Sequence, residues 1–216
     1  MADGFDTASE PVARRVTSGL AKIGAVLKSW AWKAAGPEGV TPTQAQALGH
    51  LYQRPASLGA LAAQLGVSAA TASNAVGTLV RKGLVVKEPG VNKRSVTLRL
   101  TEAGESMANR AGEWPDVLSR AVETLDPEEQ TAMLLSLVKL IRMLQQNGAI
   151  SPQRMCVTCR YFQPRVHQDP ERPHHCAYLD EPFGDRLLRL DCPEQVDAPP
   201  EQQELAWQSF TSSGAA

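Results

Sequence analysis

The feature that most constrains this chain is a short helix, a turn containing glycine and a second helix, predicted over residues 57–82. Ser57 and Ser68 are each suited to cap the start of a helix, and Gly66 is suited to the turn between them. Gly83 follows the last residue of the second apolar repeat and suits a helix stop. This pattern predicts a helix-turn-helix, a motif that places its second helix in the major groove of DNA.

The second helix of this motif has two different faces. Its apolar residues share one side, which predicts burial, whereas the opposite side carries small or polar residues and a single charge. Small side chains permit close approach, and hydroxyl and amide groups can bond to base edges or phosphates. An ordinary solvent-facing surface is the alternative. The candidate DNA-binding residues on this helix are Ser68, Thr71, Ser73, Asn74, Thr78 and Arg81.

A basic hairpin is predicted directly after this helix. Residues 84–86 and 96–100 have strand patterns, and residues 88–94 between them carry turn residues. Residues 81–99 hold six Lys or Arg and one acidic residue, whereas the whole chain has a formal net charge of −1. This local charge predicts a wing whose Lys93 and Arg94 contact phosphates or the minor groove. A solvated hairpin with incidental charge is the alternative.

Long amphipathic helices are predicted on both sides of this region, over residues 11–32 and 127–147. The apolar face of the second helix is wider than a winged helix alone can cover. We therefore expect them to pair with each other and with a second subunit, and packing wholly within one subunit is the alternative. The predicted fold class is mainly α with a small β-hairpin wing, an α+β winged helix with helical dimerisation elements at both ends.

Three stretches of this region resemble the MarR family of bacterial transcription regulators. LAAQLGVSAATASNAVGTLVRKGLV resembles the helix-turn-helix of the family, NKRSVTLRLTEAG resembles its wing and the start of the next helix, and the long outer helices resemble its dimerisation elements. The resemblance implies a homodimeric repressor that binds a pseudo-palindromic operator on double-stranded DNA, with Arg94 in the minor groove. Asn92 stands where the family usually has Asp, a departure that affects how Arg94 is oriented.

All four cysteines lie beyond residue 151, where the composition changes. Their spacing is C-x2-C-x16-C-x15-C, and many prolines and three of the four histidines accompany them. A segment so poor in apolar residues is not expected to build its own core, and such units are usually held by metal or disulfides. In a reducing compartment metal is the better interpretation. The candidate ligands are Cys156, Cys159, Cys176 and Cys192.

Two cofactors remain open for these cysteines. Zn2+ is the commoner occupant, but zinc ribbons usually carry two paired knuckles, whereas Cys176 and Cys192 stand singly. The spacing, with Phe162 soon after the first pair, is similar to the cluster-binding stretch of high-potential iron–sulfur proteins, which implies an iron–sulfur cluster. We favour the cluster. His174 or His175 could replace a cysteine, although a solvated role, or one that supports the ligands without contacting the metal, is the better interpretation of both, and four free thiols are the remaining alternative.

The predicted organisation is a disordered N-terminus (1–10), a winged-helix DNA-binding and dimerisation domain (11–150), a four-cysteine segment (151–197) and a flexible tail (198–216). Neither a signal peptide nor a membrane span is apparent, so a cytoplasmic, bacterial protein is expected. No catalytic motif appears, and an enzyme is not expected. The predicted function is a DNA-binding regulator modulated at its four-cysteine site. A regulator of the same type that senses a small-molecule effector and holds a structural zinc, or a winged-helix protein-interaction module, is the alternative.

Overall fold

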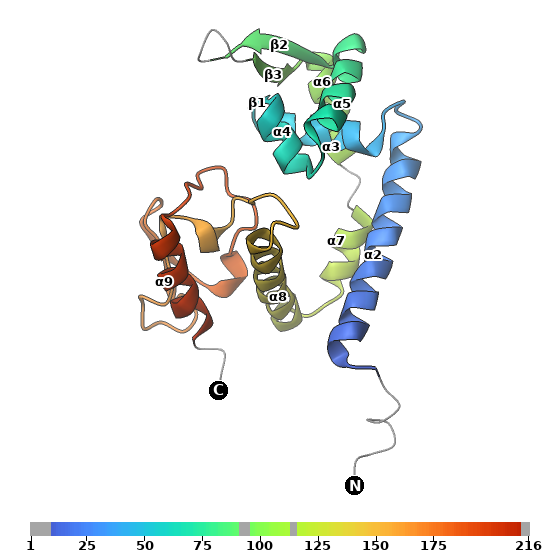
Figure 1. Cartoon of the computed structure of the whole chain (residues 1–216). Coiled ribbons are helices and arrows are strands. Elements are labelled where there is room, and N and C mark those ends of the chain that lie inside the picture. The colour runs from blue at the N-terminus through green and yellow to red at the C-terminus, as the bar shows by residue number, and fades with distance from the viewer. Residues whose placement is uncertain (1–9, 91–95, 113–115, 213–216) are drawn as a thin grey trace. The chain divides into compact units, whose positions relative to one another are not determined.

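The computed structural model describes residues 10–90, 96–112 and 116–212. The chain divides into two compact units, Met1–Asp116 and Val117–Ala216 (Figure 1). This boundary differs from the predicted one near residue 150, because α8 (Pro127–Gln146) packs with the cysteine-containing segment.

The first unit is a set of helices with one small antiparallel sheet. Its sheet has the order β1-β3-β2, and β2 pairs with β3 from Val85 opposite Leu100 to Pro89 opposite Val96. The two-residue strand β1 is absent from the sequence prediction. The elements are α2 (Val12–Ala35), α3 (Pro42–Gln53), β1 (Ala56–Ser57), α4 (Leu58–Leu65), α5 (Ala69–Arg81), β2 (Val85–Pro89), β3 (Val96–Leu100) and α6 (Glu102–Gly112).

Side-chain caps begin three helices of this unit. Thr41 and Gln44 form a capping box at α3, in which each side chain accepts a hydrogen bond from the other residue's backbone N–H. Ser57 Oγ accepts from the N–H of Ala60 at 3.2 Å, and Ser68 Oγ accepts from the N–H of Thr71 at 3.1 Å. These caps begin α4 and α5 at the predicted residues.

A close backbone approach joins α6 to the start of β2. The Thr101 hydroxyl donates to the carbonyl of Gly83 at 2.7 Å and accepts from the N–H of Gly104 at 3.0 Å. A methyl group at Gly104 would overlap the carbonyl oxygen of Leu84, so only glycine fits there. The core beside this contact is formed by Leu48, Leu61, Val76, Leu79, Val85 and Leu98.

The apolar side chains of α2 are largely exposed. They recur every three or four residues along the helix, and Val16 and Ile23 keep 51% and 39% of their surface exposed. Among the described helices, none is long and apolar enough to cross a membrane. An exposed stripe of this kind is open to packing against another protein surface. The stripe consists of Val12, Val16, Leu20, Ile23, Val26, Leu27 and Trp30.

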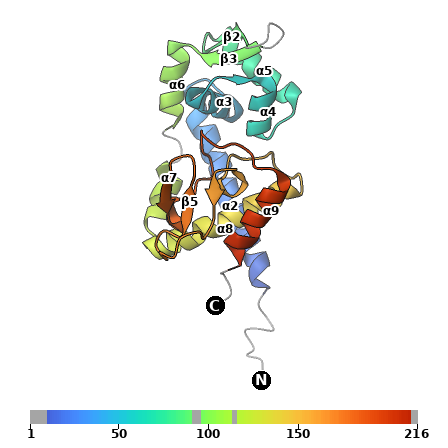
Figure 2. The same ribbon diagram turned by 90° about the vertical axis from the view of Figure 1, so that its left-hand side faces the viewer.

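In the second unit, the four cysteines lie in the sequence between α8 and the last helix, α9. Its sheet is antiparallel in the order β4-β5-β6, and Figure 2 shows β5 and α9. Asp126 caps α8 and forms a capping box with Glu129. The elements are α7 (Asp116–Glu123), α8, η1 (Cys156–Thr158), β4 (Phe162–Gln163), β5 (His174–Cys176), β6 (Glu181–Phe183), η2 (Asp185–Leu187) and α9 (Pro200–Thr211).

The cysteine segment has an apolar core, contrary to the expectation from its composition. α8 and α9 supply part of it, so the segment does not have to build a core from its own residues alone. Phe162 lies at its centre, with ring centroids 5.3 Å from His174 and 6.1 Å from Phe210. The buried members are Val138, Met155, Val157, Phe162, Leu188 and Phe210.

The predicted flexible tail is wrong for the described residues after 198, because α9 is a packed helix. Phe210 is 4% exposed, and the Arg142 guanidinium lies 4.6 Å from the centroid of the Trp207 ring. Arg142 also pairs with Glu204 at 3.8 Å. Two aromatic residues on one helix face bury enough apolar area to order a segment whose overall composition is polar. Leu205, on the other side, is 68% exposed.

Candidate DNA interface and four-cysteine pocket

The polar face of α5 is exposed, as the two-faced pattern predicts. Ser73 and Asn74 are exposed, whereas Ala72, Val76 and Leu79 on the other side are buried in the core. The apolar side therefore anchors the helix and leaves hydroxyl and amide groups free to face a partner. Groups of this kind bond to both base edges and phosphates.

The start of α5 carries two hydroxyl groups in contact. Ser68 Oγ and Thr71 Oγ1 lie 2.9 Å apart, and both residues are exposed. The Ser68 hydroxyl already accepts the Thr71 N–H, so its first role is the helix cap. The positive end of the helix dipole lies at the same place, which favours a negatively charged partner such as a phosphate.

At the C-terminal end of α5, the side chain of Arg81 is held in place by a hydrogen bond. Arg81 Nη2 donates to Thr78 Oγ1 at 2.8 Å, and Thr78 Oγ1 donates to the carbonyl of Asn74 at 3.1 Å. Arg81 is exposed and Thr78 is half-buried. The chain of bonds orients the guanidinium along the helix, where it could reach a phosphate.

The β2–β3 hairpin presents fewer unengaged cations than the sequence implies. Arg99 Nε pairs with Glu88 Oε2 at 3.1 Å across the two strands, and Lys82 Nζ donates to the carbonyl of Gly39. Lys87 on β2 is exposed. Lys93 and Arg94, the predicted tip residues, lie outside the described residues.

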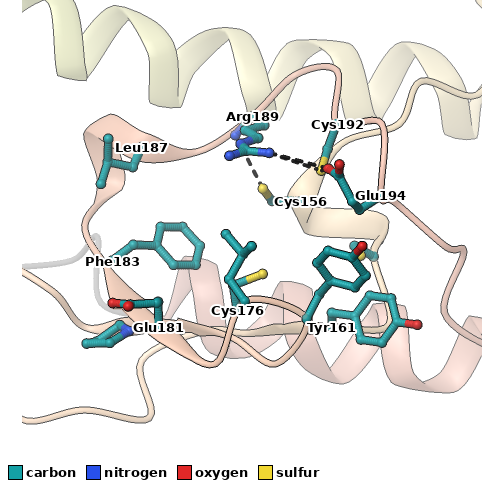
Figure 3. A pocket seen from close by; sticks show the side chains of 13 residues that line it. Cys156, Tyr161, Cys176, Glu181, Phe183, Leu187, Arg189, Cys192 and Glu194 are labelled. Carbon is teal, nitrogen blue, oxygen red and sulfur yellow. Dashed lines mark hydrogen bonds and ion pairs between the residues drawn. The ribbon is translucent and has the colours of Figure 1, made fainter. Parts of the chain in front are cut away.

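All four cysteines line one pocket of the second unit, of about 280 Å³ (Figure 3). Cys156 begins η1, Cys159 follows it, Cys176 ends β5, and Cys192 lies in the loop before α9. All four are free and partly buried. The fold therefore brings together four residues that the sequence separates by up to 16 positions between neighbours.

Arg189 holds two of these cysteines. Its backbone N–H donates to Cys156 Sγ at 3.3 Å, and its Nη1 lies 3.6 Å from Cys192 Sγ (Figure 3). The guanidinium also pairs with Glu194 at 3.6 Å, and Cys192 Sγ donates to Glu194 at 3.4 Å. Sequence reasoning missed Arg189 because no spacing or periodicity links it to the cysteine pattern.

The thiols of this pocket influence one another electrostatically. Burial raises the pKa of the Cys156 thiol to about 11, the Arg189 N–H opposes that rise, and the other three cysteines add to it. Within the ranges that the structure describes, no three Cys, His, Asp or Glu side chains are close enough to hold one metal ion. The sulfurs thus surround a common space without converging on a single point.

The two candidate histidines do not line this pocket. His174 is fully buried, its Nδ1 accepts from the N–H of Arg165 at 3.2 Å, and its Nε2 bonds to Asp185 at 2.7 Å. Burial lowers the pKa of His174. His175 Nε2 pairs with Asp180 at 3.3 Å. Both histidines have partners outside the set of cysteines.

The helix-turn-helix followed by an antiparallel hairpin makes the first unit a winged helix. Residues 38–95 match the model of the MarR family.

Two solved structures of MepR share this fold. MepR of Staphylococcus aureus in its DNA-binding conformation is 24% identical, with a TM-score of 0.55, over 60% of this chain and 98% of that chain. The S. aureus MepR–DNA complex is 22% identical, with a TM-score of 0.54, over 59% of this chain and 97% of that one. Wild-type MarR of E. coli in its apo form is 21% identical, with a TM-score of 0.48, over 62% of this chain and 98% of that one. No curated protein sequence matches the chain.

Proposed function

We propose that this chain is a DNA-binding transcription regulator of the MarR type, in which α5 reads the major groove and the β2–β3 hairpin acts as the wing. One observation carries the proposal: the polar face of α5 is exposed beside the hairpin strands, while its apolar face is buried. The fold likeness to MepR, solved in a DNA-binding conformation and in a DNA complex, supports the architecture on which the proposal rests.

The proposed regulator acts as a homodimer and a repressor. The exposed apolar stripe on α2 supports dimerisation, because a surface of this kind is stabilised when a second copy covers it. Two copies of α5 would then read the two halves of a pseudo-palindromic operator. A dimer bound across a promoter would exclude the polymerase.

The experiment that tests DNA binding starts from a random duplex library, because the operator is unknown. The full chain selects sequences from the library, and affinity for the enriched duplex is measured over a salt series. Arg81→Ala should weaken binding about tenfold and reduce the salt slope by about one, since it removes one phosphate contact. Asn74→Ala should relax base preference rather than the salt slope.

The matched control is Arg172→Ala, which removes the same charge from an exposed ion pair with Asp169 in the second unit. It should leave affinity and slope unchanged. If no sequence is enriched, or if both arginine variants weaken binding equally, the regulator proposal fails and the winged helix becomes a candidate protein-interaction module.

We assign control of this activity to the four-cysteine pocket. Its four thiols border one space and are a donor set suited to a metal or an iron–sulfur cluster. Cys192→Ser should change the affinity for the selected duplex if the pocket regulates DNA binding. Unchanged affinity would reduce the pocket to a structural role and favour a small-molecule effector bound elsewhere.

A further inference from the structure

We propose that the four-cysteine pocket holds an iron–sulfur cluster rather than a single zinc ion, with Arg189 as its positioning residue. The inference deepens the proposed function by naming the cofactor, and it rests on that function only for the link to DNA. The four cysteines already limit which metals the pocket can bind, because four thiolates are typical of zinc and of iron–sulfur centres.

The spread of the cysteines argues against a single ion. Zinc bound by four thiolates at about 2.3 Å brings the sulfurs to about 3.8 Å from one another. In the described part of the chain, no such convergence of three or more ligands occurs, although all four cysteines border one space of about 280 Å³. A cluster needs this arrangement, because its own iron and sulfide atoms stand between the thiolates.

The lining of the pocket also suits a cluster. Aromatic and aliphatic side chains form much of its wall, including Tyr161, Phe183 and Leu187 (Figure 3). The polarity of such a wall is one of the factors that set a cluster's stability and potential. The pocket rests on a core that α8 and α9 complete, so the fold has an apolar support besides any cofactor.

Arg189 supplies hydrogen-bond donors and a positive charge beside the cysteine sulfurs. Its N–H and its guanidinium reach two different cysteines, Cys156 and Cys192. On binding, the four thiols lose four protons and become thiolates. The bond from Cys192 Sγ to Glu194 is then lost, and the guanidinium, already paired with Glu194, lies beside the new negative charge. Hydrogen bonds to cluster sulfurs adjust the reduction potential.

The test begins with the full chain purified without oxygen. We expect equal amounts of iron and acid-labile sulfide, with broad visible absorption that falls when dithionite donates one electron to each cluster. Two or four irons per chain would both support the proposal. One zinc per chain, iron without sulfide, or failure to take up a cluster from ferrous iron and sulfide would overturn it.

Arg189→Gln tests the positioning role, and Arg186→Gln is its matched control on an exposed neighbour outside the pocket lining. Arg189→Gln should retain the cluster, lower its reduction potential and speed its loss in air about tenfold. Arg189→Lys should restore part of the potential, because it returns the positive charge. If Arg189→Gln, Arg189→Lys and the Arg186→Gln control all have the same cluster reduction potential, the proposed role of Arg189 is overturned.

Cluster chemistry and DNA binding are separable in this design. A chain that holds a cluster but enriches no DNA sequence would contradict the regulator proposal alone. A chain that binds DNA and holds zinc would overturn the cluster alone. Cys176→Ser should lose the iron and sulfide while it keeps the thermal unfolding of the first unit, which shows that the loss is local.

Discussion

Cys156 and Arg189 hold each other through two reciprocal hydrogen bonds. The Cys156 N–H donates to the Arg189 carbonyl at 3.1 Å, and the Arg189 N–H donates to Cys156 Sγ at 3.3 Å. The pair fixes η1 against the loop that leads to Cys192. One sulfur of the pocket is therefore positioned by backbone geometry, which a side-chain substitution at Arg189 leaves in place.

An added methyl group should have opposite effects on stability at two glycines of the first unit. Gly104→Ala should destabilise the first unit by about 1–3 kcal/mol, because the new methyl group would overlap the Leu84 carbonyl oxygen. Gly49→Ala is the control within α3, where an added methyl group meets nothing within 4 Å. It should stabilise the unit by about 0.5–1 kcal/mol. Urea unfolding followed by circular dichroism measures both, and equal effects would contradict the packing.

The exposed stripe on α2 predicts how the proposed dimer can be dissociated. Ile23→Glu places a charge among apolar side chains and should convert dimer to monomer. Ser18→Glu adds the same charge to an exposed polar position of this helix and should leave the dimer intact. Sedimentation equilibrium of the full chain gives both masses. A dimer that survives Ile23→Glu would place the interface elsewhere.

The packing of α9 predicts a large difference between two of its apolar residues. Phe210→Ala should cost about 3–5 kcal/mol of the second unit's stability, since Phe210 is buried against Phe162. Leu205→Ala should change stability by less than about 0.5 kcal/mol, because Leu205 is mostly exposed. Thermal unfolding monitored by tryptophan fluorescence distinguishes them. A small effect of Phe210→Ala would show that α9 does not contribute to the core.

Substitutions of Ser68 and Ser73 should separate the stability of the first unit from its affinity for DNA. Ser68→Ala removes the helix cap and should lower stability by about 1 kcal/mol. Ser73→Ala should leave the unfolding midpoint unchanged and weaken binding to the selected duplex. Paired measurements of unfolding and DNA affinity test this. If both variants lose only stability, Ser73 has no part in binding.

Much of the first unit was predictable because its signals are local. The caps at Thr41, Ser57 and Ser68 specify helix starts within a few residues of chain, and alternation specifies β3. The strand β1 was missed, since two residues are too few to show a period. The polar face of α5 follows from helical spacing, and the placement of its candidate residues agrees with that spacing.

The second unit was less predictable because its structure depends on contacts distant in sequence. Composition indicated a segment without a core, but Val138 and Phe210 come from outside that segment and complete one. The cysteine spacing indicated a common site, yet the partners of Arg189 and His174 are defined only by the folded chain. A helix such as α9, with two packing aromatics in a polar sequence, resembles a tail until its contact surface is known.

The position of α9 in the chain has a consequence for the order of synthesis. All four cysteines precede Pro200–Thr211 in the sequence, so they leave the ribosome before the helix that completes the core beneath their loops. N-terminal regions fold first during synthesis. The winged helix can thus be folded while the cysteines are still exposed, and we expect the proposed cluster to be inserted only after Phe210 has docked in the core beneath them.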